Sequence, residues 1–311
     1  TGTTGTATSA QQVGVVDINT VLDYGTGKAA GTGMVLTSSG EILTNNHVVE
    51  GSTSISVVVV STGKTYTGTV VGTDPTDDVA VVQLKDASGL ATAKLGTSSA
   101  LAVGNAVTAV GNAGGTGGAP SSATGQVTAL NQSITASDGN GSNAEQLTGM
   151  IETNAAIQAG DSGGPLYSSS GSVIGIDTAA SSSRSSGQTV GFAIPIDKAL
   201  SLAKQIESGT DNATIHQGYP AFLGVELQPT GQSATGGATI SGILNGSGAA
   251  SAGLAAGDTI TAVNGTPVAS ADALSTKMAT FNPGQQVKLS WVDSAGKSHS
   301  ATVTLGTGPA D

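Results

Sequence analysis

The chain has 311 residues, 10 % of them charged, with a formal net charge of −11 and no cysteine. This charge excludes the basic surface of a nucleic-acid-binding protein, and the absence of cysteine excludes disulfides, thiol catalysis and cysteine-ligated zinc. The length allows two or three domains, each with its own core.

Residues 1–12 have low complexity and predict a flexible N-terminus. From residue 13 to residue 206, short valine-rich runs such as VVDI, VVVV and VAVVQL alternate with turns of Gly, Ser, Asp and Asn. Many short strands at this spacing are typical of a β-barrel or a β-sandwich. No apolar run approaches the 18 or so residues that a membrane span needs.

The pattern changes near residue 195. Ile196, Leu200, Ala203 and Ile206 recur at helical spacing and predict a helix at the end of the first domain. The polar segment 207–218 predicts a linker. Residues 219–311 then predict a second β-rich domain with one helix, in the segment ASADALSTKMATF.

The hexapeptide GDSGGP, residues 160–165, places Ser162 in a glycine-rich turn. In a chain this rich in glycine and serine, a bare G-x-S-G-G string arises by chance in roughly 0.1 of cases, and adding Asp161 and Pro165 lowers this to about 0.0001. Composition therefore does not explain the motif. A serine hydroxyl becomes a nucleophile when a base takes its proton, and the base works best when a carboxylate orients it.

The chain offers three histidines as the base. His216 lies in the predicted linker and His299 lies in an alternating strand, whereas His47 follows an apolar strand in the segment EILTNNHVVEG. The carboxylate candidates are Asp77 and Asp78, which directly precede the strand VAVVQL. The two-residue alternation of a strand places them on opposite faces that are both apolar, so periodicity leaves both candidates open.

The order His, Asp, Ser is that of the chymotrypsin architecture. The motifs LTNNHVV, DDVAVVQL, GDSGGP and GFAIP resemble those of the HtrA (Deg) serine proteases, and most of all the secreted actinobacterial (mycobacterial) members. The resemblance implies a mostly β fold with a two-barrel chymotrypsin-like protease domain at 13–206 and a PDZ domain at 219–311. It also implies a secreted or cell-envelope endopeptidase that has lost a signal or anchor segment, needs no cofactor or metal, and cleaves unfolded or damaged proteins.

The resemblance assigns roles to individual residues. His47 would be the general base, Asp78 the orienting carboxylate and Ser162 the nucleophile. The backbone N–H groups of Gly160 and Ser162 would form the oxyanion hole, with Asp161 in the connecting turn. Trypsin-type zymogens pair this aspartate with a freed Ile or Val amino terminus, a route not expected for a chain that starts TGTT.

The specificity pocket would be lined by Ile157, Ala180 and Val190. Ala156 stands where enzymes that accept Lys or Arg carry an acid, so we expect cleavage after small or medium apolar residues. The segment 174–180 would pair with the substrate backbone as an added strand.

In the PDZ domain, a loop whose backbone N–H groups hold the C-terminal carboxylate of a peptide would be followed by a strand and a helix that receive the peptide. These positions fall on Phe222, Leu223, Gly224, Val225, Leu274 and Met278. For the two helix residues, spaced four apart, a simple core role is the alternative.

Two other functions compete with a regulated protease. One is a chaperone or adaptor with a resting or inactive protease barrel, and the other is a peptide-binding scaffold. The presence of all three triad residue types argues against a scaffold, which has no use for them. The family also implies a homo-oligomer, often a trimer built by N-terminal aromatic residues, but this chain has no aromatic residue before Tyr24.

Overall fold

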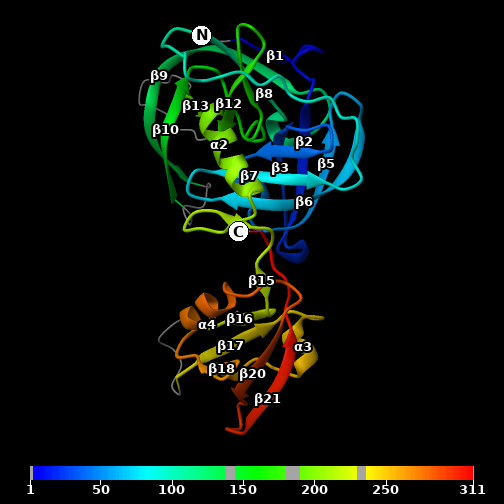
Figure 1. The fold of residues 1–311 in the computed structure, drawn as a ribbon, viewed down its shortest axis with the longest axis vertical. Helices are drawn as coiled ribbons and strands as arrows, with labels where there is room; N and C mark the ends of the chain where they lie inside the picture. The colour runs from blue at the N-terminus through cyan, green and yellow to red at the C-terminus, as the bar shows by residue number, and fades with distance from the viewer. Residues whose placement is uncertain (1–2, 138–143, 179–189, 230–235, 311) are drawn as a thin grey trace. The chain divides into compact units, whose positions relative to one another are not determined.

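The computed structural model describes residues 3–137, 144–178, 190–229 and 236–310. They form two compact units, Thr1–Gly218 with Ala310–Asp311 and Tyr219–Pro309 (Figure 1). Both units consist mainly of strands, which confirms the predicted mostly β fold. Among the described residues, no helix is long and apolar enough to cross a membrane.

The first unit begins with a closed antiparallel barrel. Its strand order is β6-β5-β2-β3-β4-β7, and β7 pairs back onto β6. In β5, Ile55, Val57 and Val59 are buried, while the alternate residues Ser54 and Ser56 are more exposed, as expected of a strand with one face in a barrel core. The six strands are β2 (Val15–Leu22), β3 (Gly27–Val35), β4 (Glu41–Thr44), β5 (Ser52–Val59), β6 (Lys64–Asp74) and β7 (Val79–Leu84).

A second barrel follows in the same unit, with the order β9-β10-β13-β12-β11-β8 and closure by pairing of β8 with β9. The helix α2 (Ile196–Glu207) comes next and packs on β6, β7 and β12, with Ile196, Ala199, Ala203 and Ile206 buried. This confirms the helix predicted from apolar spacing. The strands are β8 (Ala106–Gly111), β9 (Ser121–Ser137), β10 (Ala144–Thr153), β11 (Pro165–Ser168), β12 (Val173–Thr178) and β13 (Gly191–Pro195).

Both ends of the first unit differ from the sequence prediction. Within the predicted flexible segment 1–12, β1 (Thr4–Thr6) pairs with β9. Within the predicted linker 207–218, β14 (His216–Gln217) pairs with β6 and so extends the first barrel. Ala310 also belongs here, because its N–H and carbonyl bond to the backbone of residues 52 and 51.

The second unit is a small sheet in the order β16-β17-β18-β20-β21, with β16 (Val225–Leu227) at its edge. The helix α4 (Ala271–Met278) lies within the helical segment expected from the sequence. The remaining elements are β15 (Ala221–Phe222), β17 (Ala238–Ile243), α3 (Gly248–Ala252), β18 (Thr259–Val263), β19 (Thr266–Pro267), β20 (Gln286–Val292), β21 (Ser298–Thr304) and β22 (Gly306–Thr307).

Candidate active site

His47 lies in a one-turn helix, α1 (Asn46–Val49), which directly follows β4. The strand that the sequence predicts before His47 is β4 (Glu41–Thr44). The neighbours Asn46, Val48 and Val49 are buried, whereas the His47 side chain is 39 % exposed. The helix thus anchors the backbone in the barrel and leaves the imidazole open to solvent.

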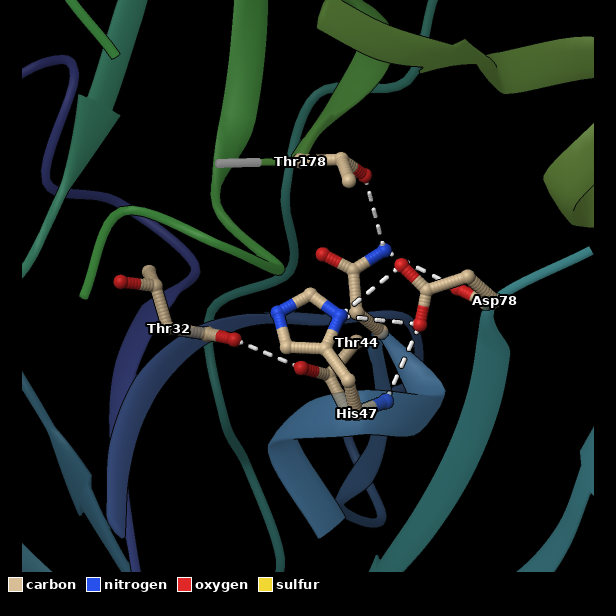
Figure 2. Close-up of polar contacts among 6 residues, drawn as sticks. Thr32, Thr44, His47, Asp78 and Thr178 are labelled. Carbon is tan, nitrogen blue, oxygen red and sulfur yellow. Dashed lines mark hydrogen bonds and ion pairs between the residues drawn. The ribbon is translucent and has the colours of Figure 1, made fainter. Parts of the chain in front are cut away.

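The carboxylate of Asp78 contacts His47 at two points (Figure 2). The Nδ1 atom of the ring lies 3.0 Å from Oδ1 and 2.9 Å from Oδ2. The backbone N–H of His47 donates to Oδ1 at 3.0 Å. Because Asp78 is 1 % exposed, a buried carboxylate fixes the orientation of an exposed ring.

The geometry distinguishes the two aspartates that periodicity left open. The Asp77 side chain pairs instead with Lys198 of α2, at 2.6 Å between Oδ1 and Nζ. Asp78 lies just before β7 with a φ of 54°, in the left-handed region, so the alternation of the strand does not extend back to it. A local backbone reversal therefore directs Asp78 toward His47.

Asn45, to which the sequence analysis assigns no role, supports this reversal. Its buried Nδ2 donates to the carbonyl of Asp78 at 2.9 Å and to the hydroxyl of Thr178 at 3.2 Å (Figure 2). It thereby ties the carboxylate-bearing turn to the end of β12. The signal was present in the motif LTNNHVV, two residues before His47, but nothing local assigns such an asparagine its distant partners.

Ser162 lies close to the helix that carries His47. Both pack against Gly31 of β3, since a Cβ placed on it would lie 2.7 Å from Val48 Cγ1 and 3.3 Å from the carbonyl oxygen of Ser162. The N–H of Thr32 donates to the same carbonyl at 2.8 Å. The first barrel therefore holds the backbone of a serine that the second barrel supplies.

The turn around Ser162 depends on glycine. Gly160 and Gly163 have φ values of 95° and 86°, and a Cβ at either residue would collide with backbone carbonyl oxygens. The carbonyl of Gly160 accepts from the Thr32 hydroxyl at 2.7 Å, and that of Ala159 accepts from the N–H of Gly114 at 2.8 Å.

The second of these bonds orients the amide of Gly160. In a trans peptide the N–H points away from the carbonyl, so the N–H of Gly160 faces away from Gly114. No group of the described residues accepts a hydrogen bond from it.

Asp161 has uncharged partners. Its carboxylate accepts from the N–H of Gln158 at 2.9 Å and from the hydroxyl of Ser121 at 3.1 Å. Burial raises the pKa of Asp161, and these two hydrogen bonds lower it in part. The aspartate of the motif is thus held by the turn itself and by β9.

A second buried carboxyl, Asp177, lies near this turn. Burial and the charge of Asp161 raise the pKa of Asp177 well above its usual range. Its carbonyl accepts from the N–H of Gly163 at 2.8 Å, and its N–H donates to the carbonyl of Gly164 at 2.8 Å. In the described part of the chain, no three acidic or histidine side chains gather as metal ligands would.

Of the three residues of the predicted specificity pocket, two lie in the described part of the chain. Ile157 is half-buried, and its side chain lies against Gly191. Val190 is also half-buried but packs on a different core cluster, and Ala180 lies outside the described residues. The predicted pairing of substrate with 174–180 is wrong for 174–177, because β13 flanks this part of β12 on one side and β11 and the Gly163–Gly164 turn flank it on the other. Thr178 pairs with β13 alone, and residues 179–180 lie outside the described residues.

In the second unit, the predicted peptide-binding residues fall into two groups. Leu274 and Met278 are buried in the core of the second unit, which agrees both with a simple core role and with a place at the floor of a peptide site. Phe222, Leu223, Gly224 and Val225 lie in and after β15, at the start of the edge strand β16.

In the loop at Leu223 and Gly224, the backbone carbonyls are hydrogen-bonded within the described part of the chain and the N–H groups are not. Their carbonyls accept from the N–H groups of Ala249 and Leu244, at 3.1 and 3.0 Å. No acceptor for the N–H groups of Leu223 and Gly224 occurs among the described residues. Gly224 has a φ of 81°, and a Cβ there would collide with Ser247.

Two family models match the chain. Residues 31–176 match the trypsin-like peptidase domain, and residues 212–291 match the PDZ domain. The first match contains both His47 and Ser162.

The relatives and the solved structures agree with these matches. The chain is 35 % identical to the serine protease PepD of Mycobacterium tuberculosis over 91 % of its length, and 36 % identical to the periplasmic pH-dependent serine endoprotease DegQ of Escherichia coli over 89 %. It spans only 62 % and 59 % of these two proteins. The structure of the HtrA-type protease AlgW with a tripeptide aligns with 98 % of the chain and 99 % of that structure, at 28 % identity and a TM-score of 0.54. The chain therefore belongs to the HtrA/Deg-type serine proteases that combine a trypsin-like domain with one PDZ domain.

Proposed function

We propose that the chain is a serine endopeptidase in which Ser162 attacks the peptide carbonyl, His47 is the general base and Asp78 orients His47. The observation that carries this proposal is the buried carboxylate of Asp78 on Nδ1 of the exposed His47 ring. When Nδ1–H donates to Asp78, the neutral ring presents Nε2 as an acceptor, which is the state that can take the proton of a serine. The proton then passes from His47 to the leaving amine.

The N–H groups of Gly160 and Ser162 would bind the oxyanion of the tetrahedral intermediate. Two observations support this role for Gly160, namely its direction away from Gly114 and the absence of an acceptor among the described residues. Loss of one such donor typically costs about 3 kcal/mol of transition-state stabilisation.

We propose cleavage after small or medium apolar residues, in a pocket lined by Ile157, Ala180 and Val190. The support is chemical, because an isoleucine, an alanine and a valine offer no charge to bind Lys or Arg. A cleavage profile from a peptide library tests this preference, and dominance of Lys or Arg at the cleaved bond would contradict it.

The PDZ domain would bind exposed C-termini of proteins. A peptide would add a strand to the free edge of β16, and its carboxylate would accept from the N–H groups of Leu223 and Gly224. The burial of Leu274 and Met278 allows them to form the floor of the site for the last side chain.

The names of the relatives include periplasmic endoproteases, so we place this chain outside the cytoplasm, where it would act on unfolded or damaged proteins. We also propose that it works as a homo-oligomer. Size-exclusion chromatography with light scattering measures the number of copies directly.

A fluorophosphonate probe tests the nucleophile without assuming a substrate. We expect the probe to attach to Ser162, as mapped by mass spectrometry, and unfolded casein to be hydrolysed. The Ser162→Ala variant should lose both activities. Failure of the probe to label the wild-type chain, together with intact casein and retained binding of a peptide with an apolar C-terminus, would favour the chaperone or adaptor alternative.

A further inference from the structure

A hollow of about 640 Å³ lies beside the turn that carries Gly160 and contains neither the proposed catalytic side chains nor the proposed specificity pocket. One wall is formed by Gly114, Gly115, Ala159 and Gly160. The other wall is formed by residues of the neighbouring strands β2, β3 and β5 of the first barrel (Figure 1).

The hollow runs outward from the oxyanion turn. Lys28, Ala30 and Thr32 are alternate residues of β3 and share one of its faces. Thr32 marks the inner end of this row, since its hydroxyl contacts the carbonyl of Gly160. Lys28 precedes Thr32 by four residues, which corresponds to about 13 Å along the strand at about 3.3 Å per residue.

The hollow lies on the leaving-group side of Ser162. None of the residues that line the hollow belongs to β12 or β13, or to the pocket proposed for the residue before the scissile bond. An extended peptide advances about 3.3–3.6 Å per residue. The second to fourth residues after the scissile bond therefore come within reach of the Lys28 side chain.

The chemistry of the lining favours an anion. Lys28 is the one charged residue in the lining, and it forms no ion pair with any described residue. The cross-strand register places Ser54 and Asn19 nearby, on β5 and β2, together with Ser56. Their side chains form no hydrogen bond within the described part of the chain, so they are available as donors.

A nearby carboxylate could neutralise Lys28, and Asp17 is the acidic group to consider. Asp17 follows on the same face of β2, but it lies beside Thr32 at the inner end of the row and is 4 % exposed. It is therefore about as far from Lys28 as Thr32 is, beyond a Debye length at physiological salt.

We propose that this hollow binds a carboxylate two to four residues after the scissile bond, and that Lys28 determines this preference. The carboxylate is either an acidic side chain of the substrate or the free C-terminus of a short leaving peptide. The inference rests on the proposed endopeptidase function and adds to it a substrate class on the leaving-group side.

Three quenched fluorescent peptides test the proposal. All three have the same residues before the scissile bond. The first carries Glu at the third position after the scissile bond and an amidated C-terminus. The second carries Gln there and is amidated, and the third ends at that Gln with a free carboxylate. We expect kcat/KM to be about three- to fivefold higher for the first or the third peptide than for the second, the range of an exposed ion pair, and lower in high salt.

The preference should disappear in Lys28→Gln and persist in the matched control Lys85→Gln, which removes an exposed lysine from the end of β7. The peptide that shows the preference identifies the source of the carboxylate. Cleavage of all three peptides at equal rates, or a preference that survives in Lys28→Gln, would overturn this inference and leave the protease intact. If no peptide is cleaved and the fluorophosphonate probe does not label Ser162, the proposed function fails and this inference with it.

Discussion

Replacing Asp17 by asparagine is expected to stabilise the first unit in a pH-dependent way. Asp17 lies in β2 between Thr32 and Val58 of the neighbouring strands and is 4 % exposed. No cation pairs with it in the described part of the chain. Burial raises its pKa from 3.8 to about 6.

The size of the effect follows from linkage. A rise of about two pKa units corresponds to about 3 kcal/mol, at 1.36 kcal/mol per unit. Because the folded state binds this proton more tightly than the unfolded state, the native protein loses stability as the pH rises from about 4 to about 6. The amide of the Asp17→Asn variant cannot ionise, so the stability difference between variant and wild type should grow by about 3 kcal/mol across this window and stay constant above it.

Urea unfolding followed by circular dichroism between pH 4 and pH 8 measures this difference. A Ser162→Ala background prevents self-cleavage. The single tryptophan, Trp291, lies in the second unit, so its fluorescence should be unchanged by the substitution. Asp86→Asn removes an exposed carboxylate from the first unit and is the matched control. A difference between Asp17→Asn and wild type that does not vary with pH would refute the reasoning.

Three further predictions concern the site and the second unit. Asp78→Asn should lower kcat about 10⁴-fold, as loss of the orienting carboxylate does in the Ser-His-Asp template, while Asp77→Asn should cost less than tenfold; equal losses in peptide hydrolysis would contradict the assignment. Thr32→Val removes the hydroxyl that holds the carbonyl of Gly160, so kcat should fall at least tenfold with little change in KM, and unchanged steady-state kinetics would argue against this support. Ser247→Ala removes the side chain that caps α3 and should lower the stability of the second unit by about 1 kcal/mol, seen as an earlier tryptophan transition in urea.

The sequence predicts those parts of the fold whose signals are local. The valine-rich run in β5 and the helical spacing in α2 depend on residues within one element, and both agree with the structure. The short strands β1 and β14 carry no such signal, because they exist through pairing with β9 and β6 far along the chain. Segments of three and two residues are too short for periodicity to reveal.

The candidate site shows the same division. The residue types at His47 and Ser162 follow from motifs, because their chemistry restricts what can stand there. Periodicity does not choose between Asp77 and Asp78, since one left-handed residue ends the alternation of the strand, and only the family resemblance points to Asp78. The partners of these groups come from other strands, and Asn45 reaches two of them at once.

The glycine-rich turn around Ser162 is held without a cation among the described residues. Asp161 accepts from Ser121 and from Gln158, both uncharged, and burial raises its pKa. Burial and the charge of Asp161 also raise the pKa of the second buried carboxyl, Asp177. Against the cost of burying these carboxyls stand backbone hydrogen bonds from both barrels and the hydroxyl of Thr32. Because the bonds from Thr32 to Ser162 and Gly160 close only when the two barrels are packed together, the geometry of the turn is a property of the assembled first unit.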